Sequence, residues 1–132
     1  MKGQIALSHG RWIASRKLDC SADKAWLLIT DTTLWSTWGP SVTSVACRDT
    51  FITADSHGQV VTALGLRLPF AITRYDKGKF WSWRVGKFKA TGHRVIPLTD
   101  YTCRLEFDMP WWAAAYIPVC LVALDRIVSL SE

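Results

Sequence analysis

Apolar residues recur at helical spacing near the end of the chain. Over residues 111–130 they form one continuous stripe, which consists of Trp112, Tyr116, Val119, Cys120, Ala123, Ile127 and Leu130. This spacing predicts one long helix, and Pro110 sets its start because a proline fits the first helical turn. The stripe has to be buried, and the first half of the segment is apolar all round and needs cover on more than one face.

The preceding part of the chain alternates between apolar and polar residues, which predicts β-strands. The clearest strand covers residues 102–108, where Cys103, Leu105 and Phe107 alternate with polar side chains. We predict further strands at residues 11–19, 41–48, 59–67, 68–75, 80–85 and 88–96. Turns are predicted at 57–58, 76–79 and 97–101, a break near Pro69, and a weak strand or a loop at 49–56. Residues 1–10 are treated as a tail.

Two short helices are predicted after the first of these strands. Ser21 is a suitable N-cap for a helix over residues 21–30, and Asp23 lies in its first turn, where the helix dipole favours a negative charge. A second helix over residues 31–38 ends at Gly39 and Pro40. The element order predicts an α+β fold in which an antiparallel sheet grips the C-terminal helix.

The length of 132 residues fits a single domain over residues 1–132 that can bury a core without disulfides or metal. Eight tryptophans are far more than usual for this length, and they either fill a barrel-like interior or line a cavity. The net charge of +5 is spread along the chain without a basic run, which argues against nucleic-acid binding.

The four cysteines form no CxxC pair and have no histidine at a spacing typical of metal ligands, so we expect no metal and no cofactor. Free thiols and the lack of an apolar leader are typical of a reduced, cytoplasmic protein. The apolar stretch at residues 109–124 is shorter than a usual membrane span and is interrupted by Pro110 and Pro118, which favours a buried helix.

Several motifs resemble those of a known family. Residues 18–26 (LDCSADKAW), then Asp31 and residues 35–40 (WSTWGP), resemble the N-terminal signature of the polyketide cyclase/dehydrase and lipid-transport family, which belongs to the START and birch-pollen-allergen helix-grip superfamily. Residues 72–76 (ITRYD) and 92–97 (GHRVIP) match later landmarks of that family in order. The resemblance implies a helix-grip fold, with a curved antiparallel sheet wrapped around the C-terminal helix and an apolar cavity between them.

Candidate ligand contacts follow from this arrangement. They are the aromatic, apolar and polar residues expected to face the interior: Trp35, Trp38, Trp81, Trp83, His93, Leu105, Phe107, Tyr116 and Cys120. Alternatives stay open for several of them. Trp35 and Trp38 could be structural contacts between helix and sheet, and Tyr116 a core residue. Trp81 and Trp83 could form an exposed aromatic patch for a partner or a dimer contact, and His93 could lie on the outer face or bond to a neighbouring strand. His93 is the sharpest polar candidate, because a histidine that faces an apolar cavity can exchange a proton with a ligand near neutral pH.

Three functions are compatible with these observations. The first, which we favour, is the binding of a small hydrophobic or aromatic ligand, such as a lipid, polyketide or isoprenoid-like molecule. The second is a cofactor-free enzyme of the polyketide cyclase or dehydrase kind. The third is a lipid or quinone carrier with peripheral membrane contact, suggested by the positive charge and by Trp111 and Trp112. The protein is expected to be a monomer or a homodimer.

Overall fold

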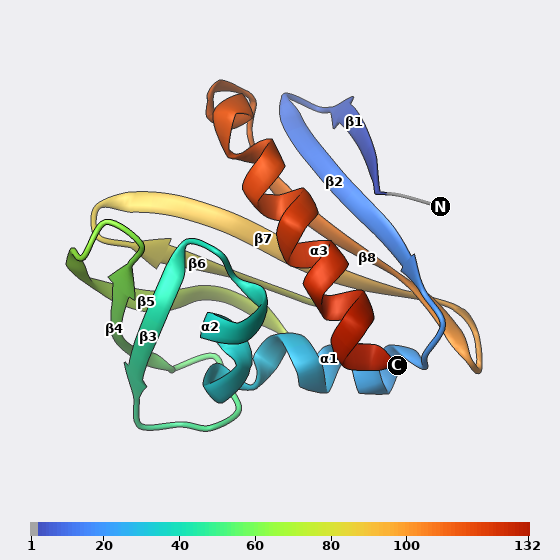
Figure 1. The fold of residues 1–132 in the computed structure, drawn as a ribbon, viewed down its shortest axis with the longest axis horizontal. Coiled ribbons are helices and arrows are strands. Elements are labelled where there is room, and N and C mark those ends of the chain that lie inside the picture. Colours follow the sequence, from blue (N-terminus) through green and yellow to red (C-terminus); the bar gives the residue numbers. More distant parts are fainter. Residues whose placement is uncertain (1–2) are drawn as a thin grey trace.

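The computed structural model describes residues 3–132 and consists of one curved sheet, a long helix on its concave face and short helices at one side (Figure 1). The strands are β1 (Gln4–Ser8), β2 (Arg11–Leu18), β3 (Val42–Cys47), β4 (His57–Thr62), β5 (Arg67–Asp76), β6 (Phe80–Val85), β7 (Phe88–Thr99) and β8 (Thr102–Pro110). The helical elements are α1 (Ala22–Thr30), η1 (Thr32–Leu34), α2 (Trp35–Trp38), η2 (Trp111–Tyr116) and α3 (Ile117–Ser131).

The eight strands form one antiparallel sheet in the order β1-β2-β8-β7-β6-β5-β4-β3. β2 therefore pairs with β8 although about ninety residues separate them, and this pairing places an early strand of the chain beside the last strand. The α+β helix-grip architecture predicted from the sequence is confirmed.

Local signals explain several of the elements. Ser21 caps α1 by accepting a hydrogen bond from the Lys24 backbone N–H at 3.1 Å, as its position predicted. β8 has the strict alternation that the sequence predicted, and Cys103, Leu105 and Phe107 are all buried.

The C-terminal segment differs from the predicted single helix. It begins as the 3₁₀ helix η2, and Ala113 has non-helical φ and ψ angles before α3 starts at Ile117. Pro118 occupies the first turn of α3, so this proline, and not Pro110, marks the start of the regular helix.

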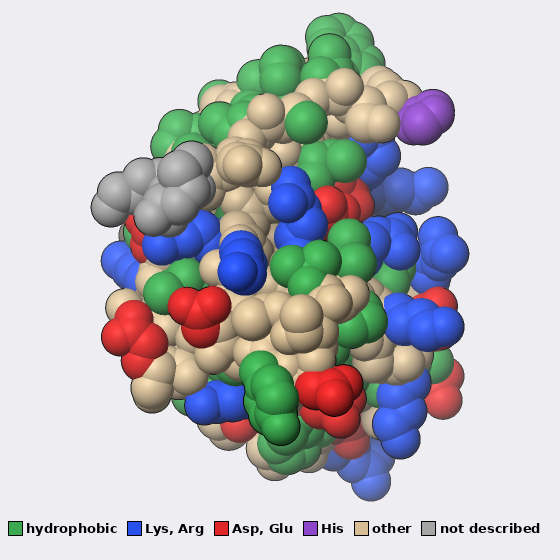
Figure 2. All heavy atoms as spheres, turned by 90° about the vertical axis from the view of Figure 1, so that its right-hand side faces the viewer, with side chains coloured by type: hydrophobic (Ala, Val, Ile, Leu, Met, Phe, Trp, Pro, Cys, Tyr) green, Lys and Arg blue, Asp and Glu red, His purple; other side chains and the backbone are tan. Residues whose placement is uncertain are grey.

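Burial along this segment also differs from the prediction. The residues of α3 that are buried are Cys120, Ala123, Leu124, Ile127 and Ser131. η2 buries none of its residues, so the prediction that the first half of the segment is covered was wrong. Figure 2 shows hydrophobic side chains gathered at the top of the molecule, the end at which η2 lies in Figure 1. By length and composition alone, Trp111–Ser131 could cross a membrane, but α3 here packs on the sheet.

Three further predictions in the sheet need correction. Residues 4–8, treated as part of a tail, form the edge strand β1, and His57 and Gly58, predicted as a turn, open β4. β4 also ends at Thr62 instead of residue 67. Residues 49–56, predicted as a weak strand or a loop, form a loop with one isolated bridge, between Phe51 and Asp31.

Prolines did not end strands where the sequence suggested. β5 runs through Pro69. The Pro69 carbonyl accepts a hydrogen bond from the N–H of Gly86, which lies just after the end of β6. Because Pro69 lies opposite a residue outside β6, the N–H that proline lacks removes no hydrogen bond between β5 and β6. β7 likewise runs through Pro97 to Thr99, with a register shift at that point.

Candidate functional site

A cavity of about 510 Å³ opens at the end of the molecule where η2 lies. Its lining is mostly apolar and includes Val60, Leu68, Trp83, Val85, Phe88, Met109, Trp112 and Tyr116. β4, β5, β6 and β7 supply the sheet side and η2 the opposite side. This volume falls within the usual range for sites that hold small molecules.

A β-bulge shapes the sheet side of this cavity. The pairing of β6 with β7 shifts register between Ser82 and Arg84, so β7 carries an extra residue opposite Trp83. A bulge of this kind bends the strand that carries it and increases its twist. Trp83, opposite the bulge, lines the cavity, as does Val85.

Tyr116 connects the two sides of the opening. Its hydroxyl lies 2.6 Å from Ser41 Oγ, at the start of the segment that leads into β3. The side chain of Tyr116 is about one third exposed, but the protein atoms around its hydroxyl keep water away and raise the pKa of Tyr116. The hydroxyl therefore stays protonated at neutral pH and can donate or accept a hydrogen bond. Together with Ser41, it provides a polar group in a mostly apolar cavity.

The interior beneath α2 is filled by aromatic rings. Trp35 stacks on Trp81, with ring centroids 5.3 Å apart and an interplanar angle of 10°. The rings of Phe70 and Trp83 lie edge-to-face with Trp35, at centroid distances of 5.4 and 5.2 Å. A crevice of only about 30 Å³ remains beside this cluster, with room for about two water molecules.

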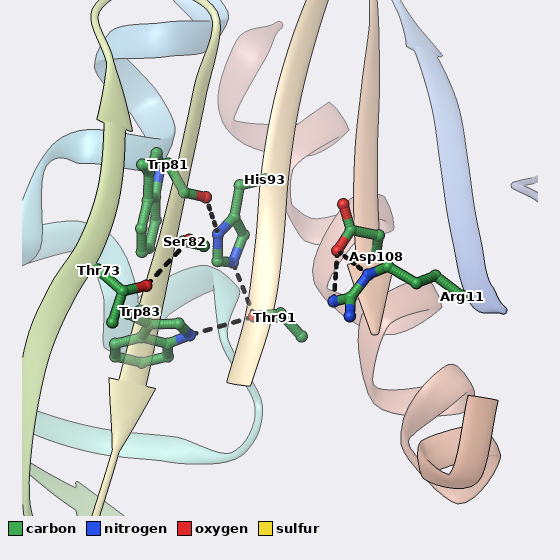
Figure 3. A network of polar contacts seen from close by, with 8 residues as sticks. All are labelled: Arg11, Thr73, Trp81, Ser82, Trp83, Thr91, His93 and Asp108. Atoms are coloured by element: carbon green, nitrogen blue, oxygen red, sulfur yellow. Dashed lines mark hydrogen bonds and ion pairs between the residues drawn. The ribbon is translucent and has the colours of Figure 1, made fainter. Parts of the chain in front are cut away.

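His93 is held inside the aromatic cluster by a directed chain of hydrogen bonds (Figure 3). Its Nδ1 lies 3.2 Å from the Trp81 carbonyl oxygen, and its Nε2 lies 3.0 Å from Thr91 Oγ1. A carbonyl can only accept, so Nδ1 carries the hydrogen and Nε2 accepts from Thr91. Thr91 Oγ1 in turn accepts from Trp83 Nε1 at 3.2 Å. Both ring nitrogens of His93 are therefore paired, whereas the buried Nε1 of Trp81 has no hydrogen-bond partner among residues 3–132.

The surroundings of His93 disfavour its charged form. The Trp81 ring stacks on the imidazole at 3.8 Å and Phe107 lies edge-on at 4.7 Å. Burial lowers the pKa of His93 to about 3, although the hydrogen bond to Trp81 works in the opposite direction. The imidazole is therefore neutral at physiological pH and has no proton available for general acid catalysis.

Most of the predicted site residues come together around the narrow crevice. Its lining includes Trp35, Trp38, Trp81, Trp83, His93, Phe107, Tyr116 and Cys120. Of these, Trp83 and Tyr116 also line the large cavity, while Leu105 is fully buried and lines neither space. The indole N–H groups of Trp35 and Trp38 donate to the carbonyls of Ile29 and Leu28 and so join α2 to α1. Their rings also contact the sheet, Trp35 at Trp81 and Trp38 at Phe107.

The sequence did not point to most of the large cavity's lining. Val60, Leu68, Val85 and Met109 look like ordinary sheet residues, and nothing in their spacing distinguishes a strand that lines a cavity from one that packs against a helix. The exceptions were Trp83 and Tyr116, which were candidate ligand contacts, and Trp112, which stood out as part of an apolar region.

Other chemistry is limited in this region. Among residues 3–132, no three His, Cys, Asp or Glu side chains are grouped so that they could hold a metal ion. Burial raises the pKa of the Cys120 thiol to about 12, so Cys120, which borders the crevice, is a protonated and weakly nucleophilic thiol.

A family model described as polyketide cyclase / dehydrase and lipid transport matches residues 13–122. The chain belongs to this family. The match covers most of the helix-grip fold, from β2 into α3, and so includes both the crevice and the large cavity. No curated protein matches the chain in sequence.

Solved structures agree with this family fold. The conserved protein of unknown function EF2215 from Enterococcus faecalis has a TM-score of 0.69 at 14% identity, over 100% of this chain and 78% of that one. The hypothetical protein jhp0584 from Helicobacter pylori has a TM-score of 0.69 at 13% identity, over 89% and 86%. XoxI from Bacillus cereus has a TM-score of 0.68 at 12% identity, over 92% and 95%. At such low identities the likeness concerns the fold alone.

Proposed function

We propose that this member of the family binds a small hydrophobic molecule in the large cavity between η2 and the sheet. The observation that supports this most strongly is the cavity itself, about 510 Å³ in size and lined mainly by apolar side chains. An apolar guest would remove these side chains from water, which is favourable by about 25 cal/mol for each Å² of apolar surface.

The polar groups around the cavity suggest the chemistry of the guest. Tyr116, Ser41 and Thr62 provide hydroxyls at one side of the opening, and Lys89 lies at its edge. We therefore expect an elongated or flat apolar molecule with one neutral or anionic polar group, placed so that this group lies near the opening.

Binding is better supported than catalysis. His93, the proton-transfer candidate, is neutral, and both of its ring nitrogens are already engaged with Trp81 and Thr91. Glu106 and Asp108 alternate with the buried residues of β8, away from its inward face. A cyclase or dehydrase reaction would need ionisable groups that converge on the guest.

The test is a titration with N-phenyl-1-naphthylamine, a neutral apolar dye that becomes fluorescent in apolar surroundings. Val85→Trp adds bulk to a half-buried residue that lines the cavity. The matched control is Val61→Trp, a half-buried valine of β4 that lines neither space. We expect the wild type and Val61→Trp to bind the dye alike, and Val85→Trp to bind it about tenfold more weakly or worse, because the cavity no longer accommodates it.

No saturable dye binding by the wild type, or equal binding by both variants, would refute the proposal. Circular dichroism and urea unfolding of each variant show whether the fold is intact, so a loss of binding cannot be mistaken for a loss of structure.

A further inference from the structure

The opening of the large cavity is surrounded by exposed apolar side chains from three separated segments. Trp111 and Trp112 come from η2, Leu64 and Leu66 from the turn between β4 and β5, and Phe88 from the start of β7. Leu64 is 87% exposed, Phe88 69% and Trp111 66%. We call these five residues the apolar rim.

The sheet topology explains why these segments meet. β4 and β6 both run towards this end, as does β8, and the connections that follow them lie side by side there. Trp112, Leu64 and Phe88 all line the one cavity, which confirms that they surround the same opening.

The charges around the apolar rim have one sign. Arg67, Arg84, Lys87 and Lys89 lie beside it in sequence, and none of them forms an ion pair with any side chain of residues 3–132. Asp108, near the end of β8, is already paired with Arg11 at 2.7 Å (Figure 3). We call the four cations the basic collar.

We propose that the apolar rim and the basic collar dock this protein on the surface of an anionic phospholipid membrane, with the cavity opening towards the lipid. Tryptophans prefer the boundary between headgroups and acyl chains, and cations near that boundary are attracted to anionic headgroups. A second copy of the chain is a poorer occupant, because pairing this end with itself would bring two unpaired basic collars together.

This proposal does not depend on the proposed ligand. Membrane docking requires only the rim and the collar, and dye binding requires only the cavity. The docking variants below leave the cavity lining untouched, so each proposal can fail without the other.

The experiment is flotation of the full chain with vesicles of phosphatidylcholine alone, or of phosphatidylcholine and phosphatidylglycerol in equal parts. Trp111→Ser with Leu66→Ser removes rim residues, and Arg67→Glu with Lys87→Glu reverses collar charges; none of these four residues lines the cavity. Matched controls at the opposite end are Leu98→Ser with Tyr101→Ser, also exposed apolar residues, and Lys77→Glu with Lys79→Glu.

We expect the wild type to float with the anionic vesicles at low salt, to be released as salt is raised, and to float poorly with phosphatidylcholine alone. Each collar cation that is lost should weaken binding about fivefold, and the double rim variant should weaken it roughly tenfold. The opposite-end variants should behave like the wild type.

Three results would overturn the proposal. The first is the absence of wild-type flotation with anionic vesicles at low salt. The second is an equal loss in the opposite-end variants, which would mean that binding follows overall charge. The third is a dimer in analytical ultracentrifugation that dissociates in the rim variant while no form of the protein floats, which would assign the rim to a second copy.

Discussion

Acidification should destabilise this protein through one buried histidine. Burial among Trp81, Trp83 and Phe107 lowers the pKa of His93 from 6.5 to about 3. In the unfolded chain the imidazole returns to its ordinary pKa. Between these two values the unfolded state binds a proton that the native state does not, so stability is complete above about pH 6.5 and falls as the pH decreases towards 3.

The magnitude follows from the same pKa difference. The free energy of unfolding should fall by about 1.4 kcal/mol for each pH unit below roughly 6, and by up to about 5 kcal/mol in all. Since a domain of this size has a total stability of about 5–15 kcal/mol, this single group can bring it close to unfolding.

The assay is urea unfolding between pH 7.5 and 4 of the wild type, His93→Gln and the control His57→Gln, which changes an exposed histidine. Glutamine cannot take up the proton, so the pH slope should be shallower by about 1.4 kcal/mol per pH unit in His93→Gln and unchanged in His57→Gln. Parallel slopes for wild type and His93→Gln would refute the reasoning. If His93→Gln fails to fold, ¹⁵N shifts of the wild-type imidazole decide the matter: a titration midpoint near 6.5 would contradict the burial argument.

Two further substitutions test the geometry of the sheet and of the opening. Gly92→Ala would place a Cβ 2.8 Å from both Asp108 Oδ1 and Phe80 Cζ. We expect urea unfolding to show a free energy of unfolding lower by about 1–3 kcal/mol. A variant as stable as the wild type would show that these two side chains move aside freely. Tyr116→Phe removes the hydroxyl that lies 2.6 Å from Ser41 Oγ. The free energy of unfolding should fall by about 1 kcal/mol, and amide hydrogen exchange in η2 should become faster. Unchanged exchange would mean that this hydrogen bond does not hold η2 at the opening.

The sequence predicted the parts of the fold in which local pattern and tertiary structure agree. β8 has one buried and one exposed face, so its alternation was plain, and Ser21 has the residue type and position that an N-cap requires. β1 was missed because it is an edge strand with almost no buried side chain, and such a strand leaves no alternating pattern.

The C-terminal segment shows why the site was harder to predict. Pro110 and Pro118 are both compatible with a helix start, and an apolar segment gives the same pattern whether it is covered by protein or left exposed at an opening. The aromatic candidates were chosen because they were expected to face inward. Which rings fill the interior and which border a cavity depends on the curvature of the sheet and on the bulge beside Trp83, and neither is visible in the spacing of residues.

The most direct test of the central claim, that the cavity beside η2 holds a small apolar molecule, is native mass spectrometry of the protein as purified. We predict that the wild type and Val61→Trp carry a bound small molecule and that Val85→Trp does not. A wild-type protein that carries no guest, or a guest retained equally by Val85→Trp, would contradict the account.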